Sequence, residues 1–102
     1  MGINCALTDE QGSKLQMVID EKNVFSKFVV DGQAGKLKLL KYIDPWGNTY
    51  FNSVQLDDLI EDIDAVIKGA KDAELTDFLS KVREYAHYCK NTQHTYIKFI
   101  GD

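Results

Sequence analysis

Long apolar runs are missing from this sequence, and their absence excludes several protein classes. A helix that spans a membrane needs about 20 consecutive apolar residues, and no stretch approaches that length, so we expect no membrane segment. The first ten residues, MGINCALTDE, contain no Lys or Arg and no long apolar core. They therefore do not resemble a signal peptide, and we expect a cytoplasmic protein.

Proline and glycine are also few, with one and seven among 102 residues, whereas 44% of the residues are hydrophobic. Disordered chains lack that much apolar surface, so the composition predicts a folded chain. A chain of this length makes one domain of ordinary size. We expect a single domain over residues 1–102 that folds without a disulfide or a metal.

Residues that commonly carry chemistry are scarce. Cys5 and Cys89 are too few for a disulfide framework or a four-thiolate zinc site, and both occupy apolar positions of the pattern, where reduced core thiols are expected. His87 and His94 lie in no recognised catalytic pattern. Glycine-rich phosphate motifs are absent. We therefore predict no catalytic residue, no metal and no cofactor.

Positive charge is in the minority, because 12 basic residues face 16 acidic ones and the net charge is −4. Five of the acids fall within residues 57–64, a stretch that contains no base. They are Asp57, Asp58, Glu61, Asp62 and Asp64. Such a distribution repels phosphate backbones and attracts basic surfaces. We expect no nucleic-acid partner, and a protein partner with a basic surface.

The N-terminal third of the chain predicts a hairpin followed by a short helix. Residues 3–8 and 15–19 alternate between apolar and polar types, which is typical of half-buried strands. Gly12 can adopt the positive φ of the turn between them. Residues 21–30 favour a short helix or an irregular connection, with Asn23 as its N-cap.

Two further regions predict strands. Residues 36–43 have an extended pattern and would pair with residues 49–51 across Asp44-Pro45-Trp46-Gly47, whose residue types suit a type I turn. Residues 95–99 alternate again and predict a last strand. The sequence leaves the place of this last strand in the sheet open.

Two helices are predicted before the last strand. The first has a capping box formed by Asn52 and Gln55, an apolar stripe at helical spacing up to Ile67, and Gly69 at its end. The second runs from about residue 72 to 90. The order β-β-(short α)-β-β-α-α-β predicts an α+β fold. Its antiparallel-leaning sheet would have about five strands and be covered on one face by two helices.

The acidic residues of 57–64 lie on the first of these helices. At about 100° per residue the carboxylates fall along two edges of the arc opposite the apolar stripe. One edge carries Asp57, Glu61 and Asp64, and the other carries Asp58 and Asp62. Like charges four residues apart destabilise a helix by about 0.2–0.5 kcal/mol per pair, and only Lys68 offers relief within the helix.

A solvated face is the simplest interpretation of this acidic helix. A basic partner would explain the same residues better. Their mutual repulsion destabilises the helix, and attraction to a basic partner would offset that cost on binding. This hypothesis requires that no cation of the same molecule neutralises the carboxylates.

Aromatic residues near the predicted turn form a second candidate surface. Trp46 lies in the middle of the turn, between Tyr42 and Tyr50 in the sequence. A tryptophan in such a turn either folds back onto the core or is presented to a partner, and the sequence leaves both open. Trp and Tyr are enriched among the residues that dominate binding energy at interfaces. We therefore count these three aromatics, with the five carboxylates, as candidate partner-binding residues.

Two segments carry a resemblance to known proteins: IDPWGNTYFN at residues 43–52 and HTYIKFIGD at residues 94–102. Together with the two amphipathic helices between them, they resemble a family of small bacterial proteins that lack an assigned enzymatic activity. In size, acidity and lack of catalytic machinery the chain also resembles immunity proteins of bacterial toxin systems, including contact-dependent inhibition. This second resemblance implies a protein that binds one cognate toxin, often a nuclease, and blocks it.

Two other functions remain open at the level of the sequence. One is a non-enzymatic adaptor or subunit that associates with itself, for example through an exposed edge strand. The other is a small hydrolase or metal-dependent enzyme, which a chain of this length gives little room for. The sequence names neither the partner nor its activity, and it leaves the oligomeric state open.

Overall fold

The computed structural model describes residues 2–101 and confirms the first hairpin. Strands β1 (Asn4–Asp9) and β2 (Lys14–Val18) pair in an antiparallel manner. In the turn between them, Gly12 has a φ of 84°, a conformation that costs glycine little because it lacks a Cβ. The carboxylate of Asp9 accepts the N–H groups of Gln11 and Ser13 at 3.0 and 2.9 Å. Local turn chemistry therefore fixes this hairpin.

Strands β3 (Asn48–Phe51) and β4 (Thr95–Ile100) complete a four-stranded sheet with the order β2-β1-β4-β3. All three pairings are antiparallel. The last strand therefore lies in the interior of the sheet, where it pairs with β1 on one side and β3 on the other. The α+β class is confirmed, whereas the expectation of about five strands is wrong by one.

The missing strand is the one predicted at residues 36–43. This segment forms a loop and a short 3₁₀ helix, η1 (Leu40–Tyr42). The N–H groups of Lys38, Leu39 and Leu40 donate to the carboxylate of Asp62 at 3.0, 2.6 and 3.0 Å. Because a side chain satisfies this backbone, it needs no neighbouring strand. The second hairpin is therefore absent, and β3 pairs with β4 instead.

Helix α1 (Val24–Val30) forms where a short helix was expected, but its cap is a different residue. Asn23 has a φ of 58° and makes no side-chain capping bond. The buried carboxylate of Asp20 accepts the N–H groups of Phe25 and Ser26 at 3.1 and 2.8 Å, and that of Ile3 at 3.2 Å. One aspartate thus caps the helix and joins it to the chain before β1.

Helices α2 (Leu56–Gly69) and α3 (Ala73–Lys90) follow the predicted boundaries closely. The capping box is present: Asn52 accepts the N–H of Val54 at 3.0 Å, and Gln55 accepts the N–H of Asn52 at 2.9 Å. It opens a 3₁₀ turn, η2 (Ser53–Gln55), that continues directly into α2. None of the helices within residues 2–101 combines the length and apolar character that a membrane crossing requires.

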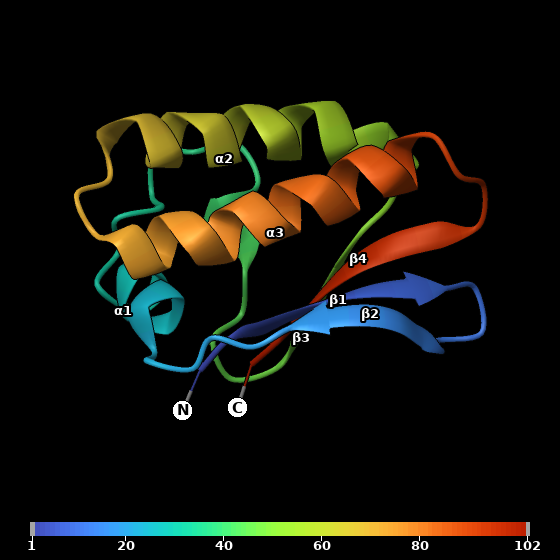
Figure 1. Ribbon diagram of the computed structural model, residues 1–102, viewed down its shortest axis with the longest axis horizontal. Coiled ribbons are helices and arrows are strands. Elements are labelled where there is room, and N and C mark those ends of the chain that lie inside the picture. The colour runs from blue at the N-terminus through green and yellow to red at the C-terminus, as the bar shows by residue number, and fades with distance from the viewer. Residues whose placement is uncertain (1, 102) are drawn as a thin grey trace.

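All three α-helices lie on one side of the sheet, as Figure 1 shows. Aromatic rings from three elements meet between the layers: the ring of Phe25 in α1 lies 5.0 Å from that of Phe78 in α3 and 5.7 Å from that of Phe99 in β4. These contacts bury a continuous apolar core. Hydrophobic burial of this kind is the main stabilising contribution to folding.

The opposite side of the sheet, here called the open face, carries no helix (Figure 1). One row of paired residues crosses all four strands there: Met17, Ala6, Lys98 and Tyr50. Ala6 is 0% exposed although no helix covers it, so the longer side chains beside it provide its cover. The open face is therefore a candidate surface in its own right.

Candidate functional site

Asp62 lies in α2 as predicted, but it is only 3% exposed and points into the molecule. Its two carboxylate oxygens accept the three N–H groups of residues 38–40 described above. The expectation that Asp62 lies on the exposed arc is therefore wrong. The physical reason is tertiary, because the loop before η1 crosses this part of α2 and supplies donors that a single helix does not reveal.

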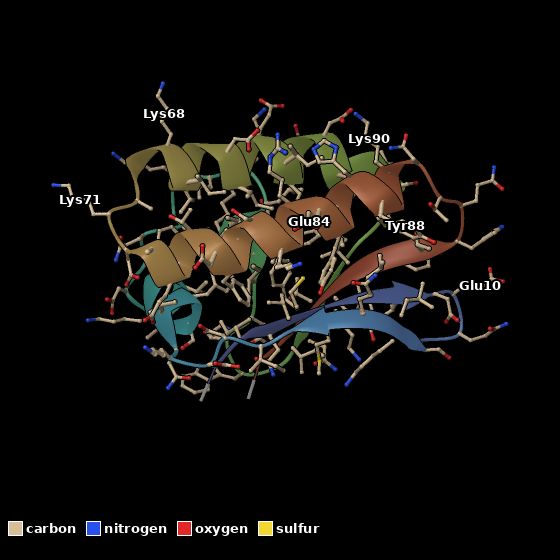
Figure 2. The ribbon with its side chains drawn as sticks, viewed as in Figure 1. Glu10, Lys68, Lys71, Glu84, Tyr88 and Lys90 are labelled. Atoms are coloured by element: carbon tan, nitrogen blue, oxygen red, sulfur yellow. The ribbon has the colours of Figure 1, made fainter. Side chains whose placement is uncertain are left out.

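The other four carboxylates are exposed, and each has a cationic partner in the same chain. Lys38 contacts both Asp58 and Glu61, at 3.4 and 3.2 Å. Arg83 of α3 contacts Asp64 at 2.6 Å. Lys90, which Figure 2 shows at the end of α3, contacts Asp57 at 2.6 Å.

These contacts contradict the premise that the carboxylates of the acidic helix have no structural role. One carboxylate holds a loop, and three cations face the remaining four. Hydrogen bonds to Glu61 and Asp58 raise the pKa of Lys38, and the hydrogen bond to Asp64 raises the pKa of Arg83. Lys68, expected to relieve Asp64, instead points away from the end of α2 (Figure 2). Much of the negative potential on this helix is therefore compensated within the molecule.

Trp46 lies on the surface, with 69% of the residue exposed, which answers the question that the sequence left open. The turn that holds it is braced at several points. The carboxylate of Asp44 accepts the N–H of Trp46 at 2.8 Å, and the N–H of Asp44 donates to the Thr49 hydroxyl at 2.9 Å. The N–H of Gly101 donates to the carbonyl of Gly47 at 2.7 Å. The indole is thus presented on a backbone tied to the end of β4.

Beside Trp46 is a shallow hollow of about 260 Å³ at the end of α1. Val30 and Lys41 line it together with Trp46, and the Lys41 ammonium lies 5.2 Å from the ring centre of Tyr42. Val30, Tyr42 and Trp46 are each more than half exposed. We call these four residues, Val30, Lys41, Tyr42 and Trp46, the turn surface.

Tyr50 lies on the open face of the sheet rather than around the hollow. It pairs in register with Lys98, whose ammonium lies 5.4 Å from the tyrosine ring centre. The sequence grouped Tyr50 with Trp46 because the two are only four residues apart. Tyr50 lies within β3, whereas Trp46 lies in the turn before that strand, so the two aromatics belong to different surfaces.

Sequence reasoning missed Val30 and Lys41, which come from other parts of the chain than the predicted turn. Val30 gave no clear signal, because the pattern of residues 21–30 left open whether this segment is a short helix or an irregular connection. Lys41 gave no signal, since its position depends on the loop that Asp62 holds. Both residues therefore required the tertiary structure.

The two thiols are placed as the sequence predicted. Cys5 and Cys89 are free and fully buried, and burial raises the pKa of each thiol, partly offset at Cys89 by a hydrogen bond with Thr95. His94 contacts Glu10 through Nδ1 at 3.0 Å. Within residues 2–101, no three side chains of His, Cys, Asp or Glu gather in a way that could hold a metal ion.

Comparisons with known proteins find no relatives for this chain. No protein-family model matches it, and searches of curated proteins and of solved structures give no significant match. The resemblance to immunity proteins therefore stays a prediction, and the functional argument rests on the surfaces described above.

Proposed function

We propose that this protein is a non-enzymatic binding protein of the immunity type, which neutralises a toxin domain by docking against the turn surface. The observation that carries the proposal is Trp46, a residue 69% exposed on a backbone held by the three hydrogen bonds described above. Exposed aromatics of this kind are the residues that most often dominate binding energy at interfaces. We infer that the partner is a toxin from the resemblance to immunity proteins.

A rigid turn strengthens this argument. Association costs free energy when loops and side chains must be ordered on binding. Here the backbone around Trp46 is ordered before any partner arrives, so more of the free energy from burying the indole remains as affinity. Val30 adds apolar area beside it, and Lys41 supplies a positive charge at the edge of the hollow. The partner surface that fits is apolar with an acidic group near its border.

The acidic helix has a smaller part in this proposal than the sequence assigned to it. Its exposed carboxylates are already paired, so a basic partner would have to exchange one set of surface ion pairs for another. Such exposed pairs contribute little free energy. We place the activity in the cytoplasm, where the two free thiols stay reduced.

The experiment uses the protein encoded beside this chain in its source genome, which the proposal expects to contain the toxin domain. We expect the full-length protein to bind that domain and to protect cells that express it. Trp46→Ala should weaken binding by about 2 kcal/mol, roughly thirtyfold, because an interface anchor is truncated. Val54→Ala is the control, since Val54 is more exposed than Trp46 but lies outside the turn surface. Isothermal titration calorimetry gives both affinities.

Three outcomes would contradict the proposal. Absence of binding by the unmodified protein would remove the immunity function. Equal affinities of Trp46→Ala and Val54→Ala would remove the turn surface. For the double variant Asp58→Lys/Glu61→Lys we expect at most about a threefold change in affinity. A large loss of affinity and of its salt dependence would show instead that the acidic helix is the main binding surface.

Self-association is the second candidate function, because β2 is an edge strand with exposed aliphatic side chains. Light scattering coupled to size-exclusion chromatography separates the two. We expect a monomer in the absence of the toxin, whereas a stable homodimer without toxin binding would favour an adaptor or subunit.

A further inference from the structure

Strand β2 forms one edge of the sheet and pairs only with β1. Half of the backbone N–H and C=O groups of an edge strand therefore face away from the sheet and can pair with another chain. Natural proteins usually protect such edges with charges, proline or bulges. Here Lys14 and a shift in register opposite Leu7 and Thr8 protect only the first end of the strand.

The rest of this edge is uncharged and partly apolar. Residues 15–19 read LQMVI. Leu15, Met17 and Ile19 are 47%, 41% and 45% exposed. An uncharged edge with alternating exposed aliphatic side chains is the surface to which an extended peptide adds as a further strand.

A groove of about 520 Å³ lies beside this edge, between α3 and the segment that follows β2. Val18, Val24 and Phe78 give it an apolar lining. Val18 points to the helix side of the sheet, because it pairs with the core residue Cys5. Side chains of an added strand that point to the helix side would therefore enter the groove.

Carboxylates outnumber cations around this groove. Its charged lining residues, apart from the buried Asp20, are Glu21, Lys22, Glu74, Asp77, Lys81 and Glu84. Two ion pairs lie within the set, Lys22 with Glu74 at 2.7 Å and Lys81 with Glu84 at 3.7 Å. Figure 2 shows Glu84 on the exposed side of α3. The negative charges of Glu21 and Asp77 remain without a partner in the ion pairs of residues 2–101.

Unpartnered carboxylates are rare elsewhere in the described chain. Among residues 2–101, only Glu21, Asp31 and Asp77 have a carboxylate with neither an ion pair nor a side-chain hydrogen bond. Two of these three line the same groove. The acidic helix, by contrast, has a cation at each exposed carboxylate.

We propose that the edge of β2 and this groove bind an extended, basic segment of a partner protein, which adds to the sheet as a fifth strand. Lysine or arginine side chains on one face of the segment would lay their aliphatic stems on Val18 and Val24 and place their charges near Glu21 and Asp77. Apolar side chains on its other face would pack against Leu15 and Met17.

A second copy of this chain does not fit the groove. Its own β2 would present Gln16 and Val18 on the helix side, since these pair with the core residues Leu7 and Cys5. Neither side chain carries the positive charge that Glu21 and Asp77 would attract. This site is also separate from the turn surface, so it does not depend on the function proposed above.

The test uses three synthetic nine-residue peptides and the full-length protein. The first alternates lysine and valine, the second alternates glutamate and valine, and the third is the lysine peptide with alternate backbone nitrogens methylated. We expect the lysine peptide to bind, with amide shifts at residues 15–20 in nuclear magnetic resonance spectra. The glutamate peptide should bind at least about tenfold more weakly because of charge. The methylated peptide should do the same because it lacks backbone donors.

Charge variants assign the binding to this groove. Glu21→Lys/Asp77→Lys should weaken binding of the lysine peptide at least about tenfold and should favour the glutamate peptide instead. Asp31→Lys is the matched control, because Asp31 is the third unpartnered carboxylate and does not line the groove. Asp77→Lys alone, at an exposed helical position, keeps the test available if the double variant is poorly folded. Trp46→Ala should bind the lysine peptide normally, whatever its effect on the toxin.

The proposal is overturned if the lysine peptide does not bind at about 1 mM. It is overturned equally if Asp31→Lys weakens binding as much as Asp77→Lys does, since net charge alone would then explain the attraction. A homodimer that covers β2 and prevents peptide binding would also overturn the proposal, because a second copy of this chain would then be the partner of the edge strand.

Discussion

At the scale of single residues, two buried aspartates accept backbone N–H groups from a helix start and from segments outside the helices and strands. Asp20 accepts three backbone N–H groups from residues 3, 25 and 26, and Asp62 accepts three from residues 38–40. In each case a charged acceptor satisfies donors that would otherwise be buried without a partner. The sequence contained one signal for Asp62, which lies three residues after Leu59 and four before Val66, both of them buried.

This role gives a prediction for Asp62→Asn. The substitution keeps the size of the side chain but removes its charge and places an amide donor among three backbone donors. We expect the free energy of unfolding to fall by about 1.5–3 kcal/mol. Asp58→Asn is the control, since its carboxylate is exposed and paired only with Lys38, and it should change stability much less. Urea unfolding measures both, and equal effects would contradict the structural role of Asp62.

At the scale of elements, the helices were predictable because their signals are local. The capping box at Asn52, the apolar stripes and the ends of α2 and α3 all lie within a few residues of what they determine. The extended pattern at residues 36–43 was misleading for the opposite reason. Its leucines alternate because the loop packs against α2, not because it belongs to the sheet. Strand pairing depends on distant residues, so the position of β4 also required the structure.

The turn before β3 shows how a distant element fixes a local one, and it predicts the effect of Gly101→Ala. A Cβ at residue 101 would lie 2.5 Å from the carbonyl oxygen of Pro45 and 2.7 Å from that of Asp44. The turn must therefore shift, and we expect a loss of about 1 kcal/mol or more in the free energy of unfolding.

The same variant should change the fluorescence of Trp46, the one tryptophan of the sequence. Gly69→Ala is the control, because a Cβ there meets no atom within 4 Å. It should leave the fluorescence unchanged and raise stability by up to about 1 kcal/mol, since alanine is the better helix former. Unchanged fluorescence in Gly101→Ala would mean that the end of β4 does not brace the turn.

At the scale of the whole molecule, the charges of the sequence are rearranged by folding. The densest run of acids becomes a helix with cations from two other elements around it, whereas the groove beside β2 collects acids from residues 21, 74, 77 and 84. A count of acidic residues along the sequence finds the cluster at residues 57–64 but not the acids that folding gathers around the groove. The sequence placed Trp46 in a turn but left its exposure open, and the hydrogen bonds that hold the exposed turn required the structure. Which surface binds is thus a property of the fold.

The sealed core also predicts how stability depends on pH. Burial raises the pKa of the Cys5 thiol above its usual value of 9.0, so the folded protein keeps this proton while the unfolded chain releases it. The contribution of this thiol to the free energy of unfolding is therefore fully present below pH 9. It falls as the pH rises further, by about 1.4 kcal/mol at pH 10. Cys5→Ala should be less stable at neutral pH yet lose less stability between pH 8 and 10.

Ile3→Val is the control, because it removes buried volume without removing a titrating group. In urea unfolding across this pH range, its stability should therefore fall as steeply with pH as that of the unmodified protein. A slope in Cys5→Ala as steep as in Ile3→Val would mean that the thiol is not sealed from water.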